Sequence, residues 1–227
     1  IKEGVEHFYM IDNGSTDDWK SQVTGAPVTI HTDKQKHQQT NHYNNYFLDE
    51  VKRNSKWVMV VDLDEFMYAR KGFNTISEYL DSVDENIGQI CVKWKMFGSN
   101  GHIKQPKSII KDFTKRLNYD KTINASFNNH KSICRTSNLI EMGNHSCKQN
   151  LYEIHVIDSG LNISEVILDD SPLHLNHYAI QSWEFFREIK MTRGASDNPA
   201  HENVRNKEYF DKYDVNEILD TELRDKR

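Results

Sequence analysis

The chain has 227 residues, with 34 acidic against 29 basic side chains and a net charge of −5 at pH 7. This length suits one large domain or two small ones and is enough to bury a sizeable core. The acidic balance gives no overall basic field, so we expect no nucleic-acid partner. The longest apolar runs are strand-sized, far short of the roughly 20 residues of a membrane span, so we expect none in this chain.

The first 70 residues alternate strand and helix signals. Apolar runs predict strands at 6–12, 27–31 and 57–61. A cap at Ser15 or Thr16 predicts a short helix ending near residue 23, and helical spacing predicts a longer one at 40–54. Strands and helices in this order are typical of a parallel α/β sheet with right-handed crossovers. We therefore expect a Rossmann-type nucleotide-binding half at residues 1–70 with a mostly parallel sheet.

Residues 71–227 change character, with a mixture of strand and helix signals. Helices are predicted at 73–83, 181–194 and 207–227, and strands at 88–98, 108–113, 131–135, 152–157 and 173–178. The run at 88–98 alternates as a half-buried strand does. No repeat or flexible linker divides the chain. We therefore expect a single domain over 1–227, in which a mixed α/β acceptor half follows the nucleotide-binding half.

Three acids crowd the end of the third predicted strand, where Asp62, Asp64 and Glu65 follow the apolar run in "KWVMVVDLDEF". Ligands of open parallel sheets bind beyond the carboxyl ends of the strands. Carboxylates this close raise one another's pKa unless a positive group lies between them, and a divalent ion with oxygen ligands, Mn²⁺ or Mg²⁺, is the usual one. An extended Asp-x-Asp places Asp62 and Asp64 on one side and Glu65 elsewhere. The alternative is a solvated turn with capping acids.

Four segments in order resemble DxD-containing glycosyltransferases of the GT-A type. "DLDEF" is similar to the motif of the family 92 (DUF23-like) enzymes and their relatives near family 2, and "FYMIDNGSTDD" resembles the turn after the second strand of their nucleotide-binding half. "LNHYAIQSWEFFREIKMTRG" and "FDKYDVNEILD" resemble two later family segments. The resemblance implies an inverting, metal-dependent enzyme that moves a sugar from a nucleoside diphosphate sugar, expected to be a UDP sugar, to a glycan or other hydroxyl acceptor. These families normally have a strand and a helix before the position of Ile1, so we expect a fragment of a longer chain.

The resemblance assigns roles to the acids and to one histidine. Asp12 matches the acid that contacts the uracil or ribose, and Asn13 lies beside it in the same turn. Asp62 would hold the ribose or a metal-bound water, and Asp64 would bind the ion that bridges the diphosphate. His177 matches a late histidine that completes the metal site, so the expected metal ligands are Asp62, Asp64 and His177.

Other residues carry weaker expectations. His174 lies three positions before His177 on a predicted strand, faces the other side, and is not expected to be a ligand. Lys190 and Arg193 would reach the diphosphate, and Lys36 and Gln39 would face the nucleotide. For Lys190 and Arg193 the alternative is a solvated helix face, and for His177 it is a structural histidine in the core or at the surface.

An inverting transfer needs a carboxylate that takes the proton of the acceptor hydroxyl. This base should come from the second half of the chain, across the sugar from the metal. The candidates are Glu141, Asp158, Asp169, Asp170 and Asp197. We choose Asp197 because it follows the helix of Lys190 in a turn, "RGASDNP", that can aim it into the cleft, with Glu141 next. The alternative is an Asp that only stabilises this turn.

Two other classes of protein remain open at this stage. Phosphatases with an aspartyl nucleophile also carry DxD after an apolar strand, but they place Thr or Val where this chain has Phe66. The third reading is a nucleotide-sugar binding module without catalysis.

The cysteines and sequons bear on the compartment. Cys91, Cys134 and Cys147 are an odd set without CxxC spacing, so we expect neither a disulfide framework nor a zinc knuckle. Asn-x-Ser sequons occur at Asn13, Asn124, Asn144 and Asn162. Because a buried Asn13 in the nucleotide turn is a poor glycan acceptor, a cytoplasmic location in a viral or bacterial setting is slightly favoured over the Golgi lumen.

Overall fold

A computed structural model of the chain describes residues 1–121, 129–150, 153–156, 163–193 and 204–226. The helices are α1 (Trp19–Gln22), α2 (Gln39–Asn54), α3 (Ile76–Asp81), α4 (Ile109–Asp112), α5 (Glu165–Asp170), α6 (Trp183–Phe185), α7 (Lys207–Tyr213) and α8 (Glu222–Lys226), with a 3₁₀ turn η2 (Thr136–Asn138) and a π-helical turn η3 (Phe186–Lys190). The strands are β1 (Phe8–Asp12), β2 (Val28–Thr32), β3 (Trp57–Met59), β4 (Glu65–Ala69), β5 (Ile87–Met96), β6 (Lys115–Arg116), β7 (His130–Arg135), β8 (Leu139–Glu141), β9 (Lys148–Gln149), β10 (Glu153–Val156), β11 (Leu173–His177) and β12 (Ile218–Leu219). No helix in these ranges is long and apolar enough to cross a membrane.

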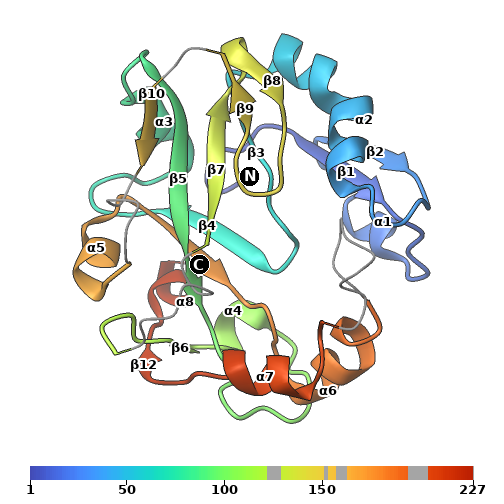
Figure 1. Cartoon of the computed structure of the whole chain (residues 1–227), viewed down its shortest axis with the longest axis vertical. Helices are drawn as coiled ribbons and strands as arrows, with labels where there is room; N and C mark the ends of the chain where they lie inside the picture. Colours follow the sequence, from blue (N-terminus) through green and yellow to red (C-terminus); the bar gives the residue numbers. More distant parts are fainter. Residues whose placement is uncertain (122–128, 151–152, 157–162, 194–203, 227) are drawn as a thin grey trace.

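The largest sheet has the strand order β3-β7-β5-β11-β4, with β10 paired to β5. The pairs β3–β7, β7–β5 and β11–β4 are antiparallel, whereas β11 and β10 run parallel to β5. The strands β1 and β2 form a separate parallel pair, against which α2 packs through Phe47 with Tyr9 and Ile11. Figure 1 shows β5 and β7 in the centre, β1, β2 and α2 together at one side, and α6 and α7 at the lower end.

The expectation of a mostly parallel sheet is wrong, although the fold is mixed α/β. The first two predicted strands do pair in parallel, but the third, β3, pairs antiparallel with β7. The apolar pattern of Trp57–Val61 indicates a strand without saying which partner it takes, and β7 comes from the second half of the chain. Residues from both halves of the chain therefore share one sheet.

Three local expectations also differ from the structure. Gly88–Met96 is buried at every position because both faces of β5 are covered, so this strand is not half-buried. Residues 109–112 form a helical turn rather than a strand, because the Ser108 side chain caps it by accepting a hydrogen bond from Lys111 N at 3.3 Å. The predicted helix at 181–194 is short and ends in the π-helical turn Phe186–Lys190, and Gly194 lies outside the described residues.

A buried ionic cluster joins the end of the chain to the sheet. Lys95 on β5 lies 2.7 Å from Asp220 and donates to Tyr68 on β4 at 3.1 Å. Glu222 accepts a hydrogen bond from the same tyrosine hydroxyl at 3.0 Å and lies 2.9 Å from His174 on β11. We call these five residues, together with Arg116, which binds Asp220 at 2.7 Å, the ionic cluster. Each buried charge here has an opposite partner, which is the condition for burying it at acceptable cost.

The "DVNEILD" segment closes this end of the molecule. Asp214 accepts a hydrogen bond from Ser99 N at 2.8 Å, and Asn216 accepts one from Asn100 N at 2.7 Å. The Asn216 side chain lies so close to Gly98 that a Cβ atom there would be 2.5 Å from its Oδ1. This family-like segment therefore acts as a brace for the chain that follows β5.

Candidate active site

The acidic motif is a tight turn between β3 and β4. Glu65 N donates to Asp62 O at 3.0 Å, and Leu63 at the tip is 86% exposed. The motif is a turn and not an extended strand end, so the expected alternation does not apply, although both Asp62 and Asp64 act on His177. The turn sets Asp62 and Glu65 against Lys131, and Asp64 against Lys190.

Two ion pairs and one protonated acid reduce the repulsion among the three carboxylates. Lys131 Nζ on β7 lies 3.1 Å from Asp62 Oδ2 and 3.5 Å from Glu65 Oε2. Burial raises the pKa of the Asp62 carboxyl, but Lys131 outweighs it and holds that pKa below its usual range. Lys190, at the end of the π-helical turn, forms an ion pair with Asp64. Burial raises the pKa of Glu65 to about 8, so this acid keeps its proton at neutral pH.

His177 lies beside Asp64, with its Nε2 atom 3.8 Å from Asp64 Oδ1. The antiparallel register of β11 and β4 places it opposite Glu65. Burial lowers the pKa of His177 to about 4, so its imidazole is neutral at pH 7. His174 belongs instead to the ionic cluster.

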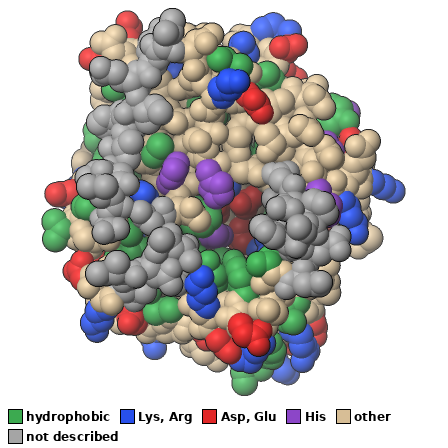
Figure 2. All heavy atoms as spheres, viewed as in Figure 1, with side chains coloured by type: hydrophobic (Ala, Val, Ile, Leu, Met, Phe, Trp, Pro, Cys, Tyr) green, Lys and Arg blue, Asp and Glu red, His purple; other side chains and the backbone are tan. Residues whose placement is uncertain are grey.

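Several buried polar atoms near His177 lack a hydrogen-bond partner. They are His177 Nδ1, Glu65 Oε1 and Trp94 Nε1. The rings of Trp94 and His177 lie 4.3 Å apart, and each residue is only 9% exposed. Buried polar groups are nearly always satisfied in native proteins, so such a group of orphaned atoms points to a ligand or to water. Figure 2 shows histidine and acidic side chains next to one another in a hollow at the centre of this face.

A cavity of about 250 Å³ lies between the end of β1 and the start of α2. Ile11 and Asn13 line one side, and side chains from residues 35–43 line the other. Gln39, in this lining, donates to Asp62 Oδ1 at 3.3 Å and to the hydroxyl of Tyr43. The cavity and the acidic turn are thus connected through one glutamine side chain.

Asp12 and Asn13 shape the turn at the entrance of this cavity. Asp12 is 5% exposed, accepts from Ser15 N at 2.8 Å and lies 2.8 Å from Lys20 Nζ. The Lys20 hydrogen bond holds the pKa of the Asp12 carboxyl well below its usual range. Asn13 donates to the backbone carbonyls of Asp33 and Gln35, at 2.6 and 2.9 Å. In the structure both side chains therefore order the loops around the cavity.

The other predicted residues are scattered. Lys36 and Arg193 are exposed. Asp169 pairs with Arg70 and Asp170 with Lys71. Arg70 and Lys71 follow the C-terminal end of β4, whereas Glu65 begins this strand. Glu141 is exposed at the end of β8. Asp158 and the chosen base, Asp197, lie outside the described residues.

The cysteine pattern in the sequence predicts no disulfide framework, but the structure has a disulfide between Cys134 and Cys147. Their Cα atoms lie 6.5 Å apart, within the range that a disulfide spans. The bond closes the loop that carries β8 and returns to β9. An odd number of cysteines cannot reveal which two of them meet in space.

Sequence reasoning missed Lys131, which contacts the acidic turn, and Trp94, whose ring packs on that of His177. Lys131 lies on β7 and reaches the acidic turn through the pairing of β7 with β3 and β5. A lysine within the apolar strand "HKSICR" is a weak signal of a buried charge partner.

A comparison with family models places the chain in a known enzyme family. The model of glycosyltransferase family 92 matches residues 1–225. The chain therefore belongs to glycosyltransferase family 92, and it is a transferase enzyme with a sugar donor and an acceptor. This sets aside the phosphatase and the binding module. A comparison with curated proteins finds no match.

Proposed function

We propose that the chain transfers a sugar from a nucleoside diphosphate sugar, a UDP sugar, to a hydroxyl acceptor with inversion, in a GT-A-like active site. The observation that carries the proposal is the continuity of the cavity with the acidic turn through Gln39, which touches Asp62 at 3.3 Å. A nucleoside in the cavity directs its diphosphate toward Asp62 and Asp64. His37 and Tyr43 in the lining suit a flat base.

The side chains around Asp64 fit a divalent ion in their chemistry. Asp64 supplies oxygen, and His177 supplies a neutral ring nitrogen, a combination that suits Mn²⁺ and, less well, Mg²⁺. The orphaned Nδ1 atom of His177 indicates that this ring expects a further partner. Among the described residues no three acidic, histidine or cysteine side chains form a preassembled metal site, and Lys190 engages Asp64. Asp64 and His177, with Asp62 beside them, would hold the ion once Lys190 releases Asp64.

The reaction places negative charge on the leaving group. The acceptor oxygen bonds to the anomeric carbon as the bond from that carbon to the phosphate oxygen breaks, and the electron pair leaves with UDP. The ion supplies Lewis acidity toward the diphosphate. Lys190, released from Asp64, contributes a second positive charge at the same place. Lys131 stays on Asp62 and keeps that carboxylate ionised and in position.

The Cys134–Cys147 disulfide supports an oxidising compartment for this enzyme, because such bonds are rare in cytosolic proteins. This proposal departs from the cytoplasmic setting favoured by the sequence. Asn13 remains a poor glycan acceptor, since its amide nitrogen already donates to two carbonyl groups.

A donor screen tests the proposed function. The melting temperature is measured with Mn²⁺ and each of UDP, GDP, CDP, UMP and the common UDP sugars, and release of UDP is followed for those that bind. Because a ligand of the native state raises the melting temperature, UDP with Mn²⁺ should raise it more than UMP does. The proposal would be contradicted if UMP and UDP raised the melting temperature equally. It would also be contradicted if no nucleotide raised it.

A further inference from the structure

One ring nitrogen of His145 is held in a hydrogen bond close to the candidate active site. Its Nδ1 atom lies 3.0 Å from the backbone carbonyl oxygen of His130. Since a carbonyl oxygen can only accept, Nδ1 donates this bond, and in the neutral ring Nε2 is then the nitrogen with the lone pair. The side chain is exposed. A neutral imidazole whose tautomer is fixed in this way is prepared to accept a proton at Nε2.

Two contacts fix the position of His145 relative to the acidic turn. Its ring lies 5.5 Å from that of Trp94, which lies 4.3 Å from the ring of His177. Lys131 Nζ, which binds Asp62 at 3.1 Å, also donates to the carbonyl of Asn144 at 2.9 Å. One buried ammonium group therefore joins the motif to the residue just before His145.

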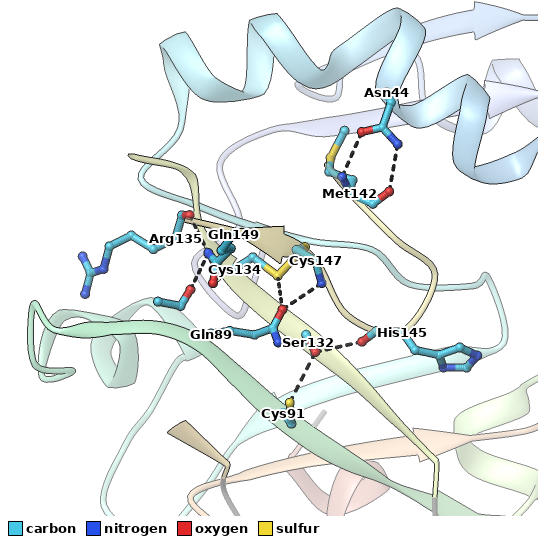
Figure 3. Close-up of a disulfide and its surroundings, with 11 residues drawn as sticks. Asn44, Gln89, Cys91, Ser132, Cys134, Arg135, Met142, His145, Cys147 and Gln149 are labelled. Carbon is cyan, nitrogen blue, oxygen red and sulfur yellow. Dashed lines mark hydrogen bonds between the residues drawn. A yellow bond between two sulfur atoms is a disulfide. The ribbon is translucent and has the colours of Figure 1, made fainter. Parts of the chain in front are cut away.

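The loop that carries His145 is fastened on several sides. The Cys134–Cys147 disulfide closes it, and Ser132 donates to His145 O at 2.8 Å. Asn44 on α2 exchanges two hydrogen bonds with the backbone of Met142, both at 2.8 Å. Figure 3 shows these contacts and the imidazole pointing away from the disulfide. Such support is what a catalytic group needs if its geometry is to be set before substrate binds.

The rings of His145, Trp94 and His177 follow one another from the exposed surface to Asp64. Trp94 Nε1 is buried in this row without a partner. A pyranose offers hydroxyl groups that can satisfy such an atom, and aromatic rings pack well against its apolar face. A donor sugar held against Trp94 would have the acidic turn on one side and His145 on the other, as inversion requires.

We propose that His145 is the general base of the transfer, an assignment that rests on the function proposed above. His145 Nε2 takes the proton of the acceptor hydroxyl as the acceptor oxygen forms its bond to the anomeric carbon. The bond to the phosphate oxygen breaks with its electron pair leaving on UDP, and the imidazolium returns its proton to solvent. The titratable group that lies against His145 is His130 on β7, whose own charged neighbours are Lys93 and Lys131.

The test compares His145→Ala and His145→Gln with the unchanged protein and with the matched control His7→Ala, an exposed histidine that bonds to Thr29. The assay is release of UDP from the UDP sugar that best stabilises the unchanged protein, with water and with methyl glucoside as acceptors. Turnover of both His145 variants should fall by roughly 10²–10⁴-fold, while the control keeps normal turnover. The affinity for UDP with Mn²⁺ and the melting temperature should not change.

Two further readouts separate a base from a structural residue. The fall of turnover on the acidic side of the pH profile should disappear in His145→Gln. Added imidazole should restore part of the turnover of His145→Ala, in proportion to its unprotonated fraction. Near-normal turnover in both variants, or loss of turnover together with loss of UDP affinity and no rescue by imidazole, would overturn the assignment. Unchanged protein that binds no nucleotide would overturn the proposed function instead.

Discussion

Strands β4 and β11 carry two charged clusters that differ in one respect, whether the buried polar groups have partners. In the ionic cluster, Lys95 meets Asp220 at 2.7 Å and Tyr68 at 3.1 Å, and His174 meets Glu222 at 2.9 Å. Around the acidic turn, His177 Nδ1 and Glu65 Oε1 have no hydrogen-bond partner. Tyr68 pairs with His174 and Glu65 with His177 in the same two strands, so the clusters share one scaffold.

The difference indicates which cluster holds the fold and which awaits a ligand. Complete pairing lets the ionic cluster attach the end of the chain to the sheet without a further partner. Orphaned atoms beside a neutral histidine and a displaceable lysine are costly for stability and are retained where a ligand completes them. Mutations in the first cluster should therefore change stability, and mutations in the second should change binding and turnover.

The largest effect is expected from breaking the ionic cluster. Lys95→Ala removes a 1% exposed ammonium group and leaves the carboxylate of Asp220 with only part of its counter-charge. The free energy of unfolding should fall by about 3–5 kcal/mol, as measured by urea denaturation. The control Lys71→Ala breaks a pair with the 80% exposed Asp170 and should cost about 0–1 kcal/mol. Equal losses of unfolding free energy in Lys95→Ala and Lys71→Ala would contradict the role of the ionic cluster in holding the fold.

The second prediction is that a substitution of Asp64 lowers turnover and leaves the protein folded. Asp64→Asn keeps the side-chain shape but removes the charge that engages Lys190 and that would bind the ion. Release of UDP from the donor should fall by roughly 10²–10³-fold, the cost of losing one electrostatic stabiliser. The melting temperature should stay close to that of the control Asp81→Asn, a 74% exposed carboxylate outside the site. Turnover equal to this control would contradict the role of Asp64.

The two histidines of β11 sharpen the comparison. His177→Ala should weaken Mn²⁺ binding by about 10- to 100-fold, the range seen when metal sites are disturbed. His174→Ala should leave Mn²⁺ affinity unchanged and lower the free energy of unfolding by about 1–3 kcal/mol, because its neighbours in the ionic cluster lose a buried partner. Calorimetric titration with Mn²⁺ and urea denaturation measure the two quantities. If the two variants changed Mn²⁺ affinity equally, the assignment of His177 rather than His174 as a metal ligand would be contradicted.

The last prediction is a pH dependence of stability through Glu65. Its pKa is about 8 in the folded protein and 4.5 ordinarily. Between these values the unfolded chain has released the proton that the folded chain keeps, so this group's contribution to stability falls as pH rises. Glu65→Gln does not titrate. The unchanged protein should therefore lose stability relative to this variant from about pH 4.5 to about pH 8, measured as melting temperature against pH. A constant difference would show that Glu65 is ionised throughout.

The parts of the fold that could be predicted are those set by local pattern. The helix at 39–54 and the strands β1, β2, β5 and β11 follow from spacing and apolar runs. Pairing could not be predicted, because nothing in Trp57–Val61 specifies β7 as its neighbour. The same limit applies to the site. Asp62, Asp64 and His177 can be named from their motifs, whereas Lys131 and the Cys134–Cys147 bond depend on long-range pairing.

The central claim is that the acidic turn works through a divalent ion, and chelation tests it most directly. UDP release from the best donor is measured for the unchanged protein and for Asp64→Asn in excess EDTA, and again after Mn²⁺ is restored. Our account predicts no release in EDTA, full recovery of the unchanged protein with Mn²⁺, and no comparable recovery of Asp64→Asn. Full activity of the unchanged protein in excess EDTA would contradict it, and would leave Lys131 and Lys190 as the counter-charges of the reaction.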